Sequence, residues 1–346
     1  MINLEREIRE QPEVLARVIG MNRDTAEKIV SEAKKRDVCG IYFVARGTSD
    51  HACIYAQYLF GILAGLPCTL GTPSVFTKYG AKVDLSRYLV IGVSQSGKAE
   101  DAIEVLSSAK EQGAITVAIT NEADSPMASL AEYHLFCGAG HEASIAATKT
   151  FTSQMMLMAL LAGLWSGRED FISELNSVSG KVSELLSDFD TKITDLAERV
   201  RDIPGAVILG RGISYCIALE GALKMLETNK IKMKGYPVSD FHHGPIAQLH
   251  DGDPVFVIAP KGATFDDALE ITEKLRGVGA DIFFVTDDSA SVPSGTTGII
   301  IPNVGSELTS PFLSVLVFQM LACKMTIVRG IDPDRAGVIN KITITK

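Results

Sequence analysis

The stretch Leu89-Val90-Ile91-Gly92-Val93-Ser94-Gln95-Ser96-Gly97-Lys98 decides the expected fold. An apolar run breaks into small and polar residues, and a polar stretch of helical pattern follows over residues 99–112. This order predicts a buried strand, a tight turn and the start of a helix. Such a turn brings free backbone N–H groups and a helix N-terminus to the carboxyl edge of a sheet, where they can bind an anion.

The side chains of this turn strengthen the anion hypothesis. Ser94, Gln95 and Ser96 carry hydrogen-bond donors, and Lys98 carries a positive charge. The turn is neither a Walker loop nor a G-x-G-x-x-G motif. An ordinary strand-to-helix turn with a capping serine is therefore the alternative interpretation.

Strands and helices are expected to alternate around this stretch. Apolar runs predict strands, and longer amphipathic or apolar segments predict helices. Alternation of this kind indicates an α/β fold with a parallel sheet and crossover helices. The expected strands lie at 41–45, near 68, and at 89–94, 115–120 and 133–137; the expected helices lie at 2–35, 50–64, 99–112, 150–166 and 168–201.

The pattern then starts again in the second half of the chain. Ala45-Arg46-Gly47-Thr48-Ser49 has a counterpart in Gly210-Arg211-Gly212-Ile213-Ser214, 165 positions on. Two further segments line up in the same order: residues 88–102 with 254–268, and residues 113–120 with 279–286. We interpret the chain as a tandem duplication of one α/β domain.

The two copies differ at the turn. Where the first copy has Ser94-Gln95-Ser96-Gly97, the second has Ala259-Pro260-Lys261-Gly262, which lacks both hydroxyls, and Pro260 has no N–H to donate. A purely structural turn would not need different polar chemistry in the two copies. The first copy is therefore predicted to be the one that binds an anion, with Thr48 and Ser49 at the same sheet edge.

Composition narrows the functional classes. The chain has 346 residues, a hydrophobic content of 46% and a formal net charge of −9, which argue for two globular domains and against a nucleic-acid binder. The six cysteines form no C-x-x-C pair and are expected to be reduced and buried. The histidines show no metal-binding spacing, and the apolar runs at 155–165 and 313–323 are shorter than the roughly 20 residues of a membrane span. No metal, no membrane segment and no signal peptide are expected.

Charged residues in the second copy are candidates for acid–base catalysis. Glu220, Lys224 and Glu227 are spaced i, i+4 and i+7, so they share one helix face. Spacing alone favours a solvated ion pair, whereas the apolar flanks favour a buried carboxylate suited to acid–base work. His243 precedes Gly244-Pro245, which marks a turn, and Lys341 lies in an alternating tail that otherwise reads as an edge strand.

These motifs together resemble the double sugar-isomerase (SIS) domain family. The motifs stand in the order seen in the isomerase half of glucosamine-6-phosphate synthase, from near the start of the chain to its end. They are Ser94-Gln95-Ser96-Gly97, the segment from Glu142 through Thr148-Lys149-Thr150 to Gln154, Glu220-Gly221-Ala222-Leu223-Lys224, His243-Gly244-Pro245 and the tail with Lys341.

The resemblance implies two tandem flavodoxin-like SIS domains, each a parallel five-stranded sheet with helices on both faces. It implies an enzyme that needs no cofactor, and a homodimer in which His243 is presented to the neighbouring subunit's site. The reduced cysteines lead us to expect a cytoplasmic protein. The expected divisions are an N-terminal helical segment (1–36), SIS domain 1 (37–168), connecting helices (169–201), SIS domain 2 (202–330) and a tail that reaches the active site (331–346).

The resemblance also implies roles for individual residues. The substrate phosphate would fall on Ser94, Gln95, Ser96, Ser49, Thr48 and Lys98, and the sugar on Gly47, Glu142, Ala147 and Glu220. Glu227 would move a proton between C1 and C2, and His243 would open the sugar ring. Lys224 would lie near the sugar hydroxyls, and Lys341 would be able to form a Schiff base with the open-chain sugar.

Four departures from the synthase pattern bear on the substrate. Lys98-Ala99 replaces an acidic residue followed by threonine, and Ala147 replaces a serine that often faces the sugar. The spacing from Arg335 to Lys341 is longer than in the synthase tail. The glutaminase domain that opens the synthase is not expected here, so this chain is not expected to take ammonia from glutamine.

The first hypothesis is a glucosamine-6-phosphate deaminase that releases fructose 6-phosphate and ammonia. The second keeps the fold and changes the substrate to a 6-phosphorylated fructosamine, such as fructoselysine 6-phosphate, which a deglycase would split. The third is a non-catalytic sensor of sugar phosphates.

Overall fold

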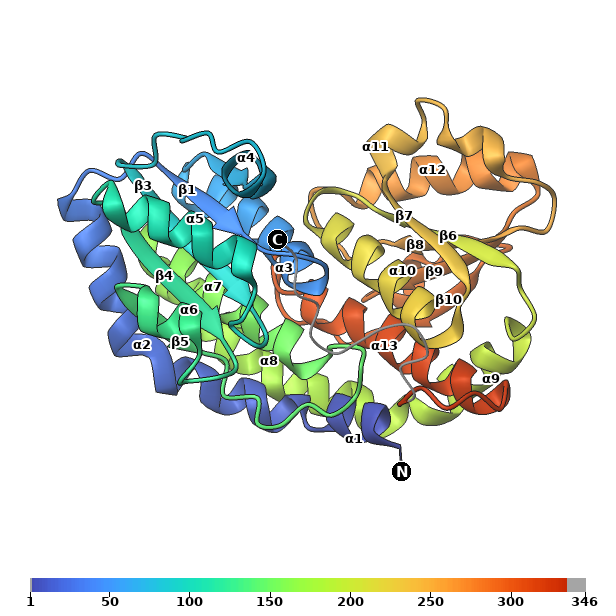
Figure 1. Ribbon diagram of the computed structural model, residues 1–346. Coiled ribbons are helices and arrows are strands. Elements are labelled where there is room, and N and C mark those ends of the chain that lie inside the picture. Colours follow the sequence, from blue (N-terminus) through green and yellow to red (C-terminus); the bar gives the residue numbers. More distant parts are fainter. Residues whose placement is uncertain (1, 335–346) are drawn as a thin grey trace. The chain divides into compact units, whose positions relative to one another are not determined.

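The computed structural model describes residues 2–334 and shows an α/β fold (Figure 1). Within that range the chain forms two parallel sheets of five strands each, which confirms the expected fold class. The first sheet contains β1 (Gly40–Val44), β2 (Cys68–Leu70), β3 (Tyr88–Ser94), β4 (Ile115–Thr120) and β5 (Tyr133–Phe136). The second contains β6 (Gly205–Gly210), β7 (Lys232–Pro237), β8 (Pro254–Ile258), β9 (Asp281–Thr286) and β10 (Thr297–Ile300).

The two sheets have the same topology. The first has the strand order β2-β1-β3-β4-β5, and the second, taken from its β7 edge, has the order β7-β6-β8-β9-β10. Each order reverses once, between the first and third strands of the repeat, as in flavodoxin-like folds. The duplication inferred from the sequence is therefore present in the fold.

Helices cover both faces of the first sheet. Tyr42, Val44 and Val90 pack against helices on one face, namely α4 (Ser74–Thr77), α5 (Glu100–Glu111) and α6 (Pro126–Leu130). The alternate strand positions point to α3 (Thr48–Leu59) and α7 (Lys149–Ser166), which pack against each other. Because both faces are buried, the strands read as apolar runs without alternation.

The second sheet is covered in the same way. Val207, Val255 and Val257 face α11 (Val238–Phe241) and α12 (Phe265–Val278). On the other face Phe256 meets Phe318 of α13 (Pro311–Val328) with ring centroids 5.7 Å apart, and α10 (Tyr215–Asn229) packs on α13. Within residues 2–334, α13 is the one helix long and apolar enough to cross a membrane, and 83% of it is buried, as in a core helix.

The correspondence between the repeats shifts by one residue at the turn. In the strands, Val90 faces α5 and Val255 faces α12, so these two residues correspond, and they are 165 positions apart. In the helices, Ala102 of α5 corresponds to Ala268 of α12, and these two are 166 positions apart. The sequence alignment of Tyr88 with Pro254 is therefore wrong by one residue along the strand. The second turn holds one more residue than the first.

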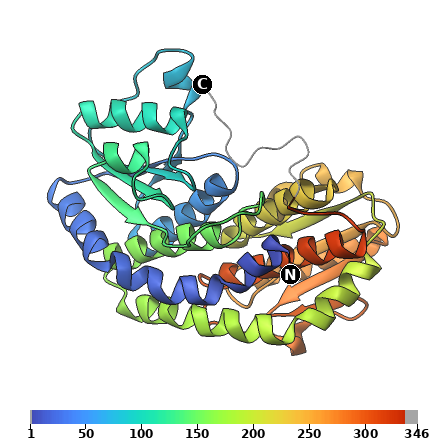
Figure 2. The same ribbon diagram turned by 60° about the horizontal axis from the view of Figure 1, so that its bottom comes forward.

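Contacts divide the described residues into two compact units. One contains residues 13–142 and 147–176, and the other contains residues 2–12, 143–146 and 177–334. The N-terminal helices are α1 (Asn3–Arg9) and α2 (Gln11–Lys35), and the expected connecting pair is α8 (Glu169–Asp188) and α9 (Asp190–Arg199). Figure 2 shows α2 in blue and α8 in green. By their bounds, each of these helices contains residues of both units.

The cysteines are free thiols, and the expectation that they are buried needs one correction. Cys53, Cys137, Cys216 and Cys323 are buried, and Cys68 is half-buried. Cys39 is exposed because it lies in the connection between α2 and β1, before the buried strand begins.

Candidate functional site

The turn after β3 is built by its own serines. Ser94 ends the strand and is 9% exposed, and its Oγ accepts a hydrogen bond from the N–H of Gly97 at 3.1 Å. The Oγ of Ser96 accepts from the N–H of Lys98 at 3.3 Å. A Cβ on Gly97, which has φ +62°, would collide with Ser125. The turn therefore closes tightly around a glycine.

This arrangement corrects one expectation about the anion site. The N–H groups of Gly97 and Lys98 are not free, because the serine hydroxyls already accept from them. Helix α5 begins only at Glu100 and has two acidic residues in its first turn, so its N-terminus adds little attraction for an anion. The serine hydroxyls remain available as donors in this turn, because a hydroxyl can accept one hydrogen bond and still donate another. Gln95 and Ser96 are half-buried, and Lys98 is exposed.

The end of β1 brings a second set of polar groups to the same sheet edge. Val44 pairs with Gly92 of β3, so these neighbouring strands end side by side at the point where the strand order reverses. Gly47, at φ +56° and ψ −131°, turns the chain into α3, whose first residues are Thr48 and Ser49. Ser49 is 8% exposed. Ligands of open α/β sheets bind at this edge, at such a reversal.

An ion pair ties the two turns together, and it occurs in both repeats. The guanidinium of Arg46, after β1, lies 2.7 Å from the carboxylate of Asp101 in the first turn of α5. In the second repeat Arg211 lies 3.4 Å from Asp267 in the first turn of α12. The segments that matched in the sequence thus contain a matched contact. It fixes the turn after the first strand against the helix that follows the third.

Glu142 caps the helix that follows β5. It is 3% exposed, and its carboxylate accepts from the N–H of Thr148 at 2.9 Å and from the hydroxyl of Thr150 at 2.8 Å. Lys149, also buried, donates to the carbonyl oxygen of His141 at 2.7 Å. These contacts fix the start of α7, close in sequence to the half-buried Ala147. They give Glu142 a structural task, and its contact with a sugar stays a prediction.

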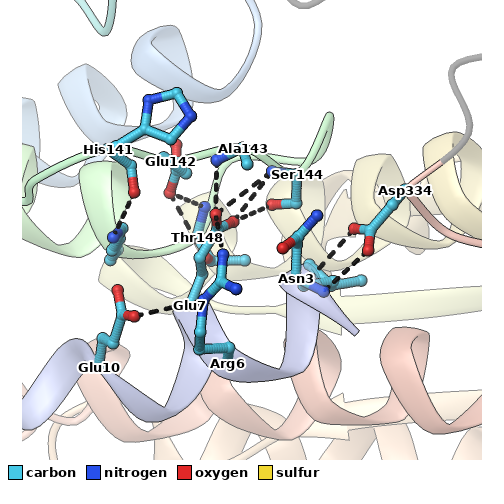
Figure 3. A network of polar contacts seen from close by, with 12 residues as sticks. Asn3, Arg6, Glu7, Glu10, His141, Glu142, Ala143, Ser144, Thr148 and Asp334 are labelled. Atoms are coloured by element: carbon cyan, nitrogen blue, oxygen red, sulfur yellow. Dashed lines mark hydrogen bonds and ion pairs between the residues drawn. The ribbon is translucent and has the colours of Figure 1, made fainter. Parts of the chain in front are cut away.

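A buried carboxylate that the sequence analysis missed holds the segment after Glu142. Glu7 of α1 is fully buried and accepts from the N–H groups of Ala143 at 2.5 Å and Ser144 at 3.1 Å, and from the Ser144 hydroxyl. Figure 3 shows these contacts beside those of Glu142. The sequence feature that could have identified Glu7 is its position as an acidic residue on the apolar face of α1, next to the buried Ile8.

Helix α10 carries the densest charge cluster of the proposed residues. The Nζ of Lys224 lies 3.2 Å from Oε1 of Glu220 and 2.7 Å from Oε2 of Glu227. Lys224 and Glu220 are 1% and 0% exposed, whereas the side chain of Glu227 is 19% exposed. The interpretation as a solvated surface pair is therefore wrong. The apolar flanks of the helix were the better signal.

The charge state of Lys224 follows from this environment. Burial works to lower its pKa, but the two carboxylates outweigh burial and raise the pKa of Lys224 to about 12. The two adjacent carboxylates therefore favour the ammonium form of Lys224. Beyond Lys224, Oε2 of Glu227 has no hydrogen-bond partner within residues 2–334. Oε2 itself is buried, and the Glu227 side chain is the partly exposed member of the cluster, with a carboxylate that can act as a proton acceptor.

The remaining candidates lie in a turn and in the tail. His243 is exposed and follows α11, and its N–H donates to the carbonyl oxygen of Asp240 at 3.0 Å. Gly244, at φ +136°, then leads into a short 3₁₀ turn at Pro245–Gln248. Lys341 lies outside the described residues. In residues 2–334, no three His, Cys, Asp or Glu side chains are placed to hold one metal ion.

Comparison with known proteins agrees with the repeat and the motifs. The family model described as SIS domain matches residues 35–164 and 201–329. The glutamine–fructose-6-phosphate aminotransferase (isomerizing) of Thermococcus kodakarensis is 34% identical over 338 residues, which cover 95% of this chain and 56% of the relative. The chain thus spans about half the length of that curated relative.

Two solved structures are similar over nearly the whole chain. A Silicibacter pomeroyi DSS-3 protein described as a candidate phosphosugar isomerase has a TM-score of 0.88 and 31% identity, covering 96% of this chain and 100% of that one. The C-terminal domain of glucosamine-fructose-6-phosphate aminotransferase from Francisella tularensis has a TM-score of 0.87 and 25% identity, covering 95% and 97%. These similarities extend over both repeats.

Proposed function

Because this chain belongs to the SIS domain family, we propose that it is a phosphosugar isomerase that deaminates glucosamine 6-phosphate to fructose 6-phosphate and ammonia. The observation that carries the proposal is the carboxylate of Glu227, whose side chain is 19% exposed at the end of an otherwise buried charge cluster. Aldose–ketose isomerisation needs one group that moves a proton between C1 and C2, and a carboxylate can do this.

The first step is to hold the phosphate. The hydroxyls of Ser94, Ser96 and Ser49, with Thr48 and the amide of Gln95, would donate to the 6-phosphate oxygens, and Lys98 would add charge. Hydrogen bonds to an ionised group are about twice as strong as neutral ones. Anchoring the unreactive end of the sugar fixes the position of C1 and C2.

The second step is proton transfer in the open-chain sugar. Glu227 would take the proton from C2 as the C2–H bond breaks, and the carbonyl oxygen on C1 would gain a proton, giving an enaminol. Return of a proton to C1 forms the new C–H bond and leaves an imine at C2. Water hydrolyses this imine to the ketone of fructose 6-phosphate and releases ammonia.

Other residues would assist this transfer. Lys224, which is 1% exposed, would position Glu227 close to the sugar hydroxyls. We propose that His243 opens the sugar ring in the site of the neighbouring subunit of a dimer, which its exposure allows. Gly47 and Ala147 keep their proposed sugar contacts. Glu220 is 0% exposed, so its proposed sugar contact could only be indirect, through Lys224. Lys341 is proposed as the residue that can form a Schiff base, and the enzyme is proposed to act in the cytoplasm.

One observation favours a second candidate substrate. Ala147 is half-buried, and the resemblance to the synthase places it where that family often has a serine. A methyl group there leaves more room and removes a hydroxyl. A 6-phosphorylated fructosamine such as fructoselysine 6-phosphate, whose amine carries a large substituent, is the alternative substrate, and the reaction would then be deglycation.

Product analysis with both substrates tests the proposal. Purified protein is incubated with glucosamine 6-phosphate or fructoselysine 6-phosphate, and ammonia, lysine and hexose phosphates are quantified. Ammonia and fructose 6-phosphate in equal amounts support the deaminase, and lysine release moves the assignment to the deglycase. Binding of both sugars without turnover would leave a sensor and overturn the enzymatic proposal.

A matched pair of variants completes this experiment. Glu227→Gln removes the proposed base with little change in shape. Glu273→Gln changes an exposed glutamate on α12 whose partner is Arg276. The proposal expects only the first variant to lose turnover.

A further inference from the structure

The turn after β8 is the second-repeat counterpart of the proposed phosphate turn, and it already holds an anion. The carboxylate of Glu307 accepts from the N–H of Ala263 at 2.6 Å and from the hydroxyl of Thr264. A Cβ on Gly262 would collide with this carboxylate, so the glycine permits its close approach. A second carboxylate, that of Asp287, accepts from the N–H of Lys261 at 2.8 Å.

The same amide has a different partner in the first repeat. The N–H that follows the loop glycine is that of Lys98 in one turn and that of Ala263 in the other. Lys98 donates to the neutral hydroxyl of Ser96 at 3.3 Å, whereas Ala263 donates to the charged Glu307 at 2.6 Å. Among residues 2–334, no carboxylate is found to accept from the backbone of residues 95–98, whereas two accept from residues 261–263.

The carboxylate that occupies the second turn, that of Glu307, has a counterpart in the first repeat. Gly305-Ser306-Glu307 stands 165 positions after Gly140-His141-Glu142, and each glutamate lies between the last strand and the last helix of its repeat. Glu142 turns to the start of α7 and caps it. Glu307 instead turns to the β8 turn. One position of the duplicated domain therefore stabilises a helix in one copy and fills a turn in the other.

We propose that Glu307 is the resident anion of a second anion-binding turn and that it keeps phosphate groups out of the second repeat. Its carboxylate uses the donors that a phosphate oxygen would need, and its charge, with that of Asp287, repels a second anion. The first repeat, whose turn uses neutral hydroxyls, stays open. This inference goes beyond the proposed function, since it concerns the other repeat and does not depend on turnover.

The test is a titration with inorganic phosphate, read residue by residue. Amide resonances of deuterated, ¹⁵N-labelled protein are followed as phosphate is added. In the wild-type protein the Ala263 amide is expected not to respond. In Glu307→Ala the turn is vacated, and the Ala263 and Thr264 amides are expected to shift with saturation. Glu273→Ala, which removes an exposed charge from the neighbouring α12, is expected to behave as the wild type.

Two results would overturn the proposal. One is a wild-type Ala263 amide that shifts on saturation with phosphate, because Glu307 would then not exclude it. The other is a folded Glu307→Ala protein whose Ala263 amide ignores phosphate. If the alanine variant does not fold, Glu307→Gln serves instead: removing the charge should admit phosphate weakly, and no response would contradict the proposal. Responses of residues 95–98 and turnover of sugar phosphates are recorded separately, so failure of the proposed function is distinguishable.

Discussion

Replacing Lys224 by methionine removes the cation that lies between two carboxylates on α10. Glu220 is 0% exposed and lies 3.2 Å from the ammonium, so the variant leaves it buried without this partner. Breaking one side of a buried ion pair typically costs about 3–5 kcal/mol of unfolding free energy. A domain is usually stable by roughly 5–15 kcal/mol, so the expected loss is a large fraction of the total.

The assay is urea unfolding followed by circular dichroism. Hydrogen exchange of the α10 amides assigns the loss to the unit that contains residues 177–334. The matched control is Lys274→Met on α12, which removes an exposed lysine 2.6 Å from Glu270 at the same i, i+4 spacing. That control should unfold as the wild type does, because exposed pairs contribute little. The double variant Glu220→Gln/Lys224→Met should recover much of the loss.

The loss should also depend on pH. Burial without the cation raises the pKa of Glu220 in the folded variant, so the folded state binds a proton more tightly than the unfolded state. The variant's deficit is therefore small below the unfolded carboxyl pKa of roughly 4.3 and grows as pH rises through the raised value. A Lys224→Met protein that loses no more stability than Lys274→Met would refute the reasoning, as would a deficit that shrinks with rising pH.

Three further predictions concern single residues. Ser94→Ala should raise KM for phosphorylated sugars by about 10–100-fold, because a hydrogen bond to a charged group contributes about 1.5–3 kcal/mol. The control is Ser187→Ala at an exposed site, and equal KM values for the two variants would contradict the assignment of Ser94 to the phosphate site. Gly47→Ala should lower the free energy of unfolding by about 1–3 kcal/mol in a thermal melt, because glycine alone readily adopts φ +56° with ψ −131°. The control Gly180→Ala, inside α8, should raise the free energy of unfolding by roughly 0.5–1 kcal/mol. An aromatic disulfide reagent should modify the exposed Cys39 quickly in the native protein. The other thiols should react slowly, because burial raises the pKa of Cys68 to about 12 and shields the remaining four from the reagent. Fast modification of two or more thiols would contradict this burial pattern.

Local sequence patterns predicted the elements and the duplication well. The strand at residues 115–120 is buried on both faces, so its apolar run was an unambiguous signal. The matched segments also contained a matched contact, Arg46 with Asp101 and Arg211 with Asp267. The one-residue shift between the repeats was missed because only the side-chain faces of Val90 and Val255 reveal it.

The contacts of single carboxylates could not be predicted in the same way. Glu7 binds Ser144, 137 positions away, and no periodicity links the two. Glu142 and Glu307 share a place in the repeat, yet the first caps a helix and the second fills a turn. Spacing placed Glu220, Lys224 and Glu227 on one face, but their burial depends on α13 packing over α10, which is a tertiary property.

Measuring cleavage of the C2–H bond of glucosamine 6-phosphate shows whether Glu227 moves a proton at this carbon. The C2 hydrogen is followed by NMR in D₂O, where its signal is lost whenever the cleaved proton is transferred to C1 or exchanged with solvent. The account predicts loss of this signal with the wild-type protein and with Glu273→Gln, and a rate about 10²–10⁴-fold lower with Glu227→Gln. A Glu227→Gln protein that cleaves the bond at the wild-type rate would contradict the account, and so would a wild-type protein that binds the sugar and leaves the signal intact.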